Sequence, residues 1–208
     1  MERLYYASVF ILRMAYLNGL MIVFSLIGCV IFGIFPALTA LFFIVRKWQL
    51  GDHHSHTART FWTVFKEEFL RSNAIGWLFT LIGMLLYVNL SLANLLESSP
   101  VHLSYYPILT VFILFISMSL LIIPVHLHFE ASMWGTIKHT FLFLFISPKN
   151  TIFVAAASFL FFLVMRTIPG FIPVVGVSGC AYIIMYFSLR IFDQVTSLTA
   201  NSLEKKEA

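Results

Sequence analysis

The chemistry of this chain has to come from a small set of ionisable side chains, and the histidines come first. His53, His54 and His56 lie within four positions, directly after Asp52. Imidazole nitrogens and a carboxylate are ligands that zinc accepts, but three or four of them must converge on one point. Neighbours in one loop seldom converge without a second element. We therefore interpret this passage as a solvated loop, with metal binding as the alternative.

A second group of polar side chains lies in or near apolar segments. His126 and Glu130 are four residues apart, a spacing that places both on one face of a helix. Ionisable groups at membrane depth can serve as a proton relay or a substrate contact, and Asn18 and Asn89 could line the same polar cavity. The alternative is structural, with His126 and Glu130 at a helix end facing headgroups and the asparagines in interhelical hydrogen bonds.

Familiar catalytic signatures are missing from the sequence. It has no phosphate-binding glycine loop, no HExxH, no GxSxG and no paired carboxylates suited to acid–base catalysis. Its two cysteines are too few for a disulfide framework. We therefore expect a protein that is not an enzyme and carries no cofactor. An intramembrane enzyme using His126 and Glu130 is the least favoured of the alternatives.

The composition indicates an integral membrane protein. Of the 208 residues, 60% are hydrophobic and 11% are charged, against roughly 25% charged in soluble domains. With a mean hydropathy of +0.93, too few polar residues remain to cover a surface in water. We expect one membrane domain over residues 1–200 and a short polar tail, 201–208. The net charge of +4 then reports topology, and we expect no nucleic-acid partner.

Five apolar segments are long enough, or nearly so, to cross a hydrocarbon core about 30 Å thick. These predicted spans are residues 14–35, 74–96, 105–125, 151–168 and 170–191. The first continues without a charge to Val45, which is too long for one straight span. Gly28, Gly33 and Pro36 offer a break in it. We expect a short helix from Pro36, a favoured first helical residue, lying in the membrane interface and ending near Arg46.

Lysine and arginine are unevenly shared between the connections. With five spans and the large loop 46–71 inside, ten of them lie inside and three outside. The positive-inside rule then places the N-terminus outside and the C-terminus in the cytoplasm. A sixth span, made from the second half of the first apolar run, would put the N-terminus inside as well. The sequence leaves five and six spans open.

A repeated pattern predicts two lateral helices. WTVFKEEFL at 62–70 and WGTIKHTFL at 134–142 share Trp, Lys, Phe and Leu at equivalent positions. Each is amphipathic, aromatic and basic, as expected of a helix in the membrane interface, and the pattern suggests an internal duplication of span, lateral helix and span. The side chains expected to anchor in the bilayer or to dock a partner are Trp62, Phe65, Lys66, Phe69, Trp134, Ile137, Lys138 and Phe141.

The residues together predict an all-α polytopic membrane bundle with about five transmembrane helices and two lateral amphipathic helices. GIFPALTALFFIVRKW at 33–48, followed by FWTVFKEEF at 61–69, resembles the YesL family of bacterial integral membrane proteins of unknown function, as does Asn18 in the leucine-rich first span. The resemblance extends from Tyr16 to Phe192. It carries over no catalytic residues, because none is established for that family.

The resemblance implies a multi-pass protein of the bacterial plasma membrane. Members of the YesL family often lie beside genes for carbohydrate ABC transporters, which implies an accessory or regulatory role in sugar transport or use. Sugar transporter subunits or another membrane protein are then the expected partners besides the lipid bilayer, and a homo-oligomer stays open. The alternative is a small transporter or channel whose substrate passes near Asn18, Asn89, His126 and Glu130.

Overall fold

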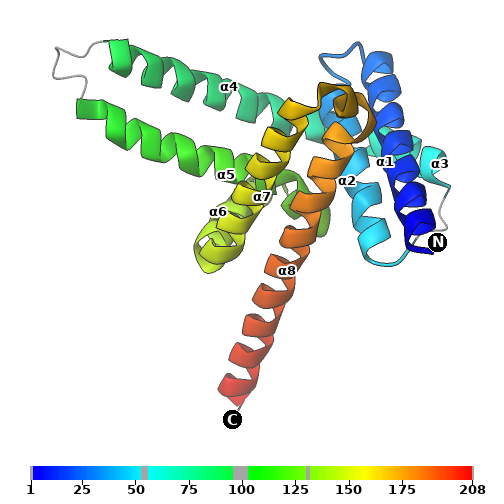
Figure 1. Cartoon of the computed structure of the whole chain (residues 1–208). Coiled ribbons are helices and arrows are strands. Elements are labelled where there is room, and N and C mark those ends of the chain that lie inside the picture. The colour runs from blue at the N-terminus through cyan, green and yellow to red at the C-terminus, as the bar shows by residue number, and fades with distance from the viewer. Residues whose placement is uncertain (1, 53–55, 96–102, 130–131, 208) are drawn as a thin grey trace.

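The computed structural model describes residues 2–52, 56–95, 103–129 and 132–207, and all regular structure in these ranges is helical (Figure 1). The prediction of an all-α fold is confirmed. The helices are α1 (Glu2–Ile27), α2 (Ile34–Gln49), α3 (Thr57–Glu67), α4 (Phe69–Leu95), α5 (Tyr105–Phe129), α6 (Met133–Ile146), α7 (Pro148–Thr167) and α8 (Val177–Glu207). A 3₁₀ turn, Pro169–Phe171, and a π-helical turn, Ile172–Gly176, precede α8. Residues 201–207, expected as a polar tail, continue α8.

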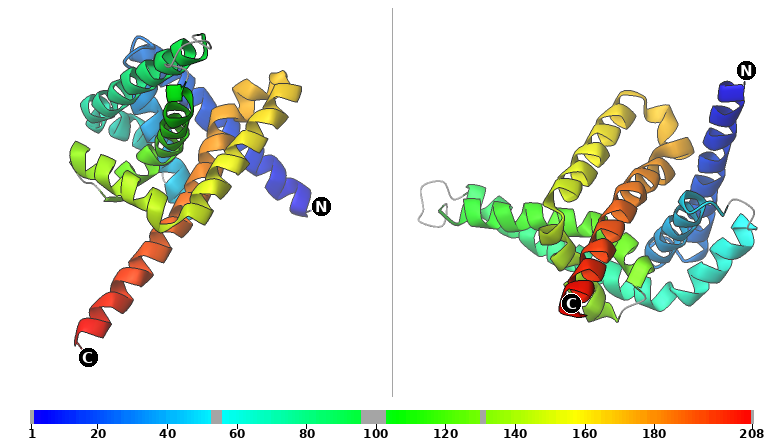
Figure 2. Two further views of the ribbon diagram at one scale, coloured as in Figure 1. Left: turned by 90° about the vertical axis from the view of Figure 1, so that its left-hand side faces the viewer. Right: turned by 90° about the horizontal axis from the view of Figure 1, so that it is seen from below.

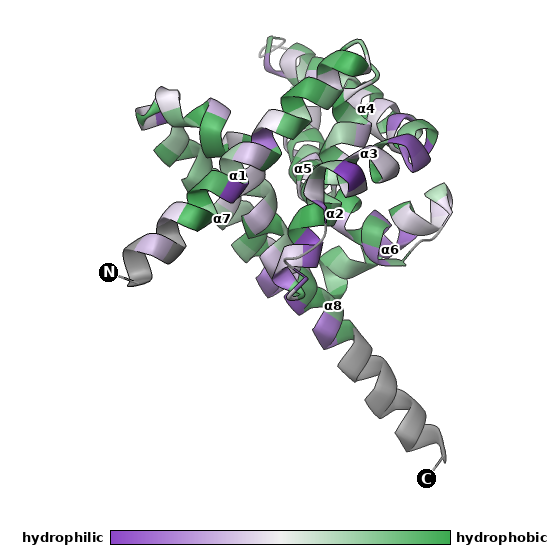
Figure 3. Ribbon diagram, turned by 90° about the vertical axis from the view of Figure 1, so that its right-hand side faces the viewer, coloured by the Kyte–Doolittle hydropathy of each residue, from purple (hydrophilic) through white to green (hydrophobic). Residues whose placement is uncertain are grey.

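Five helical segments are long and apolar enough to cross a membrane. They are Ser8–Ile27, Phe69–Leu95, Tyr105–Phe129, Pro148–Thr167 and Pro169–Val195. Each corresponds to one predicted span, although the first ends at Ile27 and not at Phe35. Hydrophobic residues dominate α4, α5 and α7, whereas polar residues gather on α3 and near the end of α2 (Figure 3). The chain is therefore a multi-pass membrane protein in its length and hydropathy pattern.

The first apolar run is broken by a tight reversal between Ile27 and Ile34. The backbone N–H of Val30 donates to the Ser25 carbonyl at 2.8 Å, and Cys29 and Val30 have φ angles of 56° and 60°. Positive φ is unfavourable for a β-branched residue, so the surrounding packing has to hold it.

Two glycines make this reversal sterically feasible. A Cβ on Gly33 would collide with the Ser25 carbonyl, and one on Gly28 would collide with the backbone of Gly33. The two chain segments therefore approach at a distance that only glycine permits. The break predicted at Gly28, Gly33 and Pro36 falls on this reversal and on the first turn of α2.

α2 is the central helix of the protein and not an interfacial one, so that expectation was wrong. It packs on α1, α3, α4, α5 and α8. Nine of its sixteen residues are buried: Pro36, Ala37, Thr39, Ala40, Leu41, Phe42, Ile44, Val45 and Trp48. Its small residues, Ala37 and Ala40, are fully buried and let neighbouring helices approach closely.

Side-chain contacts show that α1 and α8 run in opposite directions. Asn18 donates to the Pro173 carbonyl at 2.7 Å, and four residues earlier the Met14 carbonyl accepts from the Ser178 hydroxyl at 3.0 Å. Residue numbers rise along α1 as they fall along α8. The start of α1 therefore lies at the same end of the bundle as the later part of α8.

The antiparallel arrangement of α1 and α8 changes the expected topology. Five alternating crossings would make these helices parallel, with the two chain ends on opposite sides. α2 is the additional helix that reverses the chain direction. It turns back beside α1, and its Gln49 amide donates to the Tyr182 carbonyl of α8 at 2.8 Å. At sixteen residues it is only about 24 Å long. The sequence left open whether the second half of the first apolar run forms a sixth segment. In the structure this segment is a short, buried helix.

Two antiparallel hairpins, α4–α5 and α7–α8, complete the fold. The rings of Phe79 and Phe115 stack at 5.3 Å in the first hairpin, and those of Phe153 and Phe187 stack at 6.3 Å in the second. The α4–α5 hairpin diverges from the other helices and projects away from them (Figures 1 and 2). The two predicted lateral helices are present as α3, which leads into α4, and α6, which leads into α7.

We expect Gly33→Ala to destabilise the protein by about 2 kcal/mol or more, because the added methyl group has no room at the reversal. Gly19→Ala is the matched control, since a Cβ there meets nothing within 4 Å and alanine favours a helix. Thermal unfolding in detergent measures both. Equal melting temperatures for the two variants would show that the close approach at Gly33 is not needed.

We also expect both chain ends to lie on the same side of the membrane. Reporters that are active on only one side, fused at either end, should give the same answer, and a reporter inserted at Gly170 should give the opposite one. Opposite answers from the two ends would contradict the antiparallel arrangement of α1 and α8.

Candidate functional site

The lateral helix α3 turns most of its aromatic side chains inward. Phe61 and Phe65 are buried, and the Phe24 ring of α1 stacks on Phe61 at 4.9 Å. Trp62 is partly exposed, and the Lys66 ammonium lies 4.8 Å from its ring centroid. Of the predicted interaction residues in this segment, Trp62 and Lys66 therefore face outward and Phe65 belongs to the core. Phe69, which is half-buried, is already the first residue of α4.

The lateral helix α6 leaves more of its aromatic surface exposed than α3 does. Trp134 is 68% exposed and Phe141 51%, Lys138 is exposed and Ile137 is half-buried. The fully buried side chains on its inner face include Thr136 and Thr140. Their hydroxyls donate to backbone carbonyls one turn earlier, at 3.2 and 2.8 Å, which satisfies them without a partner helix. The two copies of the sequence pattern bury the same face of the helix. Val64 and Thr136 are buried at equivalent positions, whereas Trp62, Trp134, Lys66 and Lys138 are exposed.

Asn18 of α1 hydrogen-bonds to the backbone of the irregular segment that precedes α8. Its amide donates to the carbonyls of Ile172 and Pro173 at 3.2 and 2.7 Å, and its oxygen accepts from the Ser178 backbone N–H at 3.3 Å. Both carbonyls belong to the π-helical turn Ile172–Gly176, where the regular α-helical hydrogen bonds are interrupted. Asn18, only 2% exposed, therefore ties α1 to this irregular segment.

The structure does not bring Asn18 and Asn89 together with His126. Asn89 lies on the exposed face of α4 and donates to the Leu85 carbonyl of its own helix at 2.8 Å. His126 is buried near the end of α5, and Glu130 lies outside the described residues. The predicted shared cavity is replaced by separate environments, because each asparagine is engaged with backbone carbonyls where it stands.

His126 is paired with an acidic residue that the sequence analysis did not single out. Its Nε2 lies 2.8 Å from the Glu68 carboxylate, with His126 4% and Glu68 24% exposed. Glu68 caps the end of α3 at the junction with α4. The two residues are 58 positions apart, so no helical spacing predicts the pair. The available signal was an acidic residue inside the predicted lateral helix 62–70, shortly before the predicted span 74–96.

The electrostatics of this pair leave one ring nitrogen unused. The hydrogen bond from His126 lowers the pKa of Glu68, against the opposing effect of burial, and the charges of His126 and Arg71 lower it further. Glu68 is therefore a carboxylate that accepts from His126 Nε2–H. His126 Nδ1 is buried and has no hydrogen-bond partner among the described residues.

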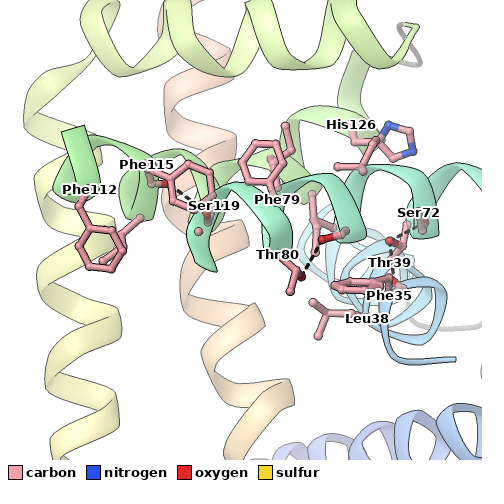
Figure 4. A pocket seen from close by; sticks show the side chains of 16 residues that line it. Phe35, Leu38, Thr39, Ser72, Phe79, Thr80, Phe112, Phe115, Ser119 and His126 are labelled. Atoms are coloured by element: carbon pink, nitrogen blue, oxygen red, sulfur yellow. Dashed lines mark hydrogen bonds between the residues drawn. The ribbon is translucent and has the colours of Figure 1, made fainter. Parts of the chain in front are cut away.

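His126 also lines a groove between α2, α4 and α5 (Figure 4). The groove has a volume of about 440 Å³ and mostly apolar walls, which include Phe35, Phe79 and Phe115. Ser72 and Thr39 add a hydroxyl pair to the lining. The Ser72 hydroxyl donates to Thr39 Oγ1 at 2.9 Å, and Thr39 donates to the Phe35 carbonyl at 3.0 Å.

The predicted histidine loop adds no site that the structure resolves. His56 is the exposed residue before α3, and His53 and His54 lie outside the described residues. Among the described residues, no three His, Cys, Asp or Glu side chains are grouped to hold a metal ion.

Comparison with known proteins gives the family. Residues 14–90 match the family model described as "Protein of unknown function, DUF624". The chain is 33% identical over 172 residues to the uncharacterized protein YteU of Bacillus subtilis (strain 168). The aligned region covers 83% of this chain and 77% of YteU. The chain belongs to the DUF624 family. The resemblance to YesL is thereby confirmed.

Two further relatives of this DUF624 protein come from the same organism. The uncharacterized protein YesV is 29% identical over 197 residues, or 93% of each chain, and the uncharacterized protein YesL is 29% identical over 148 residues, or 71% and 69%. No solved structure matches the chain. The family model covers Asn18, the α1–α2 reversal and Glu68, whereas His126 lies beyond its matched range.

We expect the Glu68 carboxylate to make stability depend on acidity. Because its pKa is lowered in the folded state, its ionised form stabilises the fold above the ordinary value of 4.5, and this contribution is lost as pH falls through the lowered folded value. Glu68→Gln should cost about 1–2 kcal/mol at neutral pH, and the difference from the unchanged protein should shrink below pH 4.5.

Thermal unfolding in detergent over a pH series measures this effect. Glu67→Gln is the matched control, because Glu67 is the exposed neighbour. A loss of stability that is the same at every pH, or the same for both variants, would contradict the role of the Glu68–His126 pair.

Proposed function

We propose that this DUF624 protein is a non-enzymatic accessory or regulatory protein of a bacterial plasma membrane that acts through contact with another membrane protein. The exposed aromatic face of α6, formed by Trp134, Phe141 and Phe145, carries this proposal. All three side chains are at least half exposed. At fourteen residues α6 is about 21 Å long, too short to span a bilayer. Exposed aromatic clusters of this kind provide much of the binding energy at protein interfaces.

We place this face on the cytoplasmic side. The bundle end that holds α6 is marked by two contacts, Arg46 to the Leu127 carbonyl and Ser147 to Gln194, both at 2.8 Å. Most of the lysines and arginines belong to connections at this end, whereas Arg166 lies at the opposite end of α7. The positive-inside rule supports a cytoplasmic location for this end and for the C-terminus.

A permease subunit of a carbohydrate ABC transporter is the partner that we propose. The support for it is the resemblance to the YesL family, whose members often lie beside genes for such transporters. The named relatives, YteU, YesV and YesL, are uncharacterized, so the partner has to be identified by experiment. The Lys138 side chain on the exposed surface of α6 would suit a partner surface with acidic groups.

A small transporter or channel is the second candidate function, and the groove that His126 lines is the observation that favours it. The groove lies between α4 and α5, two helices long enough to span a membrane. Flux through liposomes that contain only the purified protein is the test for this alternative.

We expect the double variant Trp134→Ala, Phe141→Ala to lose at least about tenfold of a co-purifying membrane partner, as the loss of interface anchors predicts. The measurement is quantitative mass spectrometry after a pull-down in mild detergent. Phe159→Ala is the matched control, an equally exposed aromatic residue on α7. Purification without any partner, or equal recovery of the partner with both variants, would overturn the proposal. Either result would indicate that lipid covers the exposed face of α6.

A further inference from the structure

We propose that a groove between α7 and the start of α8 binds an anionic phospholipid, with the phosphate at Arg166 and one acyl chain along the groove. The lining of this α7–α8 groove comes from the second half of α7, from the irregular turns Pro169–Phe171 and Ile172–Gly176, and from the first turn of α8. No residue of α6 contributes to it. The inference therefore does not depend on the proposed protein partner.

The dimensions of the α7–α8 groove suit one lipid chain. Its volume of about 550 Å³ falls within the range of about 300–1,000 Å³ that is typical of ligand pockets. Its lining residues on α7 extend from Ser158 to Arg166, which is about 12 Å along the helix. One leaflet contributes half of a hydrocarbon core that is about 30 Å thick. An acyl chain of a single leaflet is therefore long enough to fill the groove from end to end.

The groove is apolar along its length and charged at one end. Phe161, Phe162 and Met165 supply apolar walls. The Phe161 ring packs closely on α8, because a Cβ on Gly179 would lie 2.8 Å from it. Arg166, in the last turn of α7, is the one charged side chain in the lining. A phospholipid has the same pattern, since its charged head lies at the membrane surface and its apolar chains lie below it.

The charge of Arg166 selects an anionic head group. The side chain is exposed, and its guanidinium forms no hydrogen bond or ion pair with the residues that the structure describes. The sequence contains no aspartate or glutamate from Thr151 to Phe192, so this hairpin does not neutralise the charge. Arginine pairs with phosphate oxygens through two parallel hydrogen bonds. A zwitterionic head would add an ammonium group for which this end of the hairpin offers no acidic side chain.

The bilayer has direct access to the α7–α8 groove. α7 and the segment Pro169–Val195 are both candidate spans, and α7 and α8 pack side by side as a hairpin (Figure 1). Phe162 is 60% exposed, so one wall of the groove faces outward. A phospholipid can therefore enter laterally, while its head group stays at the end of α7.

The test uses the full-length protein in nanodiscs of phosphatidylcholine with a small share of phosphatidylglycerol that carries a photoreactive diazirine in one acyl chain. Mass spectrometry of the crosslinked peptides should place the label on groove residues such as Phe161 and Met165. Unlabelled phosphatidylglycerol should compete about fivefold better than phosphatidylethanolamine with the same acyl chains, as one arginine beside an anionic head predicts.

Variants of Arg166 test the choice of head group. Arg166→Gln should abolish the preference for phosphatidylglycerol over phosphatidylethanolamine, and Arg166→Lys should retain most of it, because the charge is kept. Arg13→Gln is the matched control and should leave the preference unchanged, since Arg13 is an exposed arginine on α1 outside the groove.

Two matched variants on α7 test the location. Met165 lines the groove, whereas Leu163 lies on the same helix outside the lining and is 39% exposed. Met165→Trp fills the groove and should reduce labelling at least tenfold, and Leu163→Trp should leave it unchanged. Thermal unfolding in detergent should show that both variants are folded.

Four outcomes would overturn the inference. They are labelling spread evenly over the outer faces of the spans, equal competition by the two unlabelled lipids, an unchanged preference in Arg166→Gln, and equal labelling of the two tryptophan variants. Failure of the pull-down described above would not affect any of these measurements, since it concerns α6.

Discussion

The close approach of the backbone at Gly28 and Gly33 is the constraint on which the rest of the fold depends. It turns the chain back on itself within a few residues, so that α2 runs beside α1 and into the centre of the molecule. With α2 in the centre, α3, α4, α5 and α8 all pack on the same helix. Without the reversal the first apolar run would be one long helix, and there would be no core for the other helices to surround.

Interrupted helices in a membrane protein need internal hydrogen-bond partners, because lipid supplies none. Two asparagines meet this need. Asn18 donates to two carbonyls of the π-helical turn before α8, and Asn73, buried near the start of α4, donates to the Phe32 carbonyl in the α1–α2 reversal at 2.8 Å. Each ties an irregular segment to a regular helix far away in sequence. These two polar side chains therefore hold irregular backbone in place.

The spans could be predicted from sequence because hydropathy is a local property. Residues 74–96 and 105–125 are long, mostly apolar runs without a charged residue, and the structure forms α4 and α5 there. The Gly28, Gly33 and Pro36 signals also located the break in the first run, since the steric need for glycine acts within a few residues. These features required no knowledge of which helices meet.

The features that the sequence did not predict correctly all depend on contacts between distant segments. The burial of α2 could not be read from IFPALTALFFIVRKWQ, because an apolar helix can face lipid or protein equally well. The Glu68–His126 pair joins the start of α4 to the end of α5, and only the hairpin brings them together. The deeper burial of Phe65 in α3 than of Ile137 in α6 follows likewise from the helices beneath them, which the shared Trp, Lys and Phe pattern does not specify.

The divergent α4–α5 hairpin has a consequence for where the stability of the protein resides. Its base is fixed by Phe35, Ser72 and the Glu68–His126 pair, whereas the outer turns of α4 have few buried side chains. These turns are helical by virtue of the surrounding hydrocarbon, so part of the folding free energy belongs to the lipid and not to the chain. Bilayer thickness and acyl order then become structural variables of this protein, and micelles would loosen the last turns of α4 before its base.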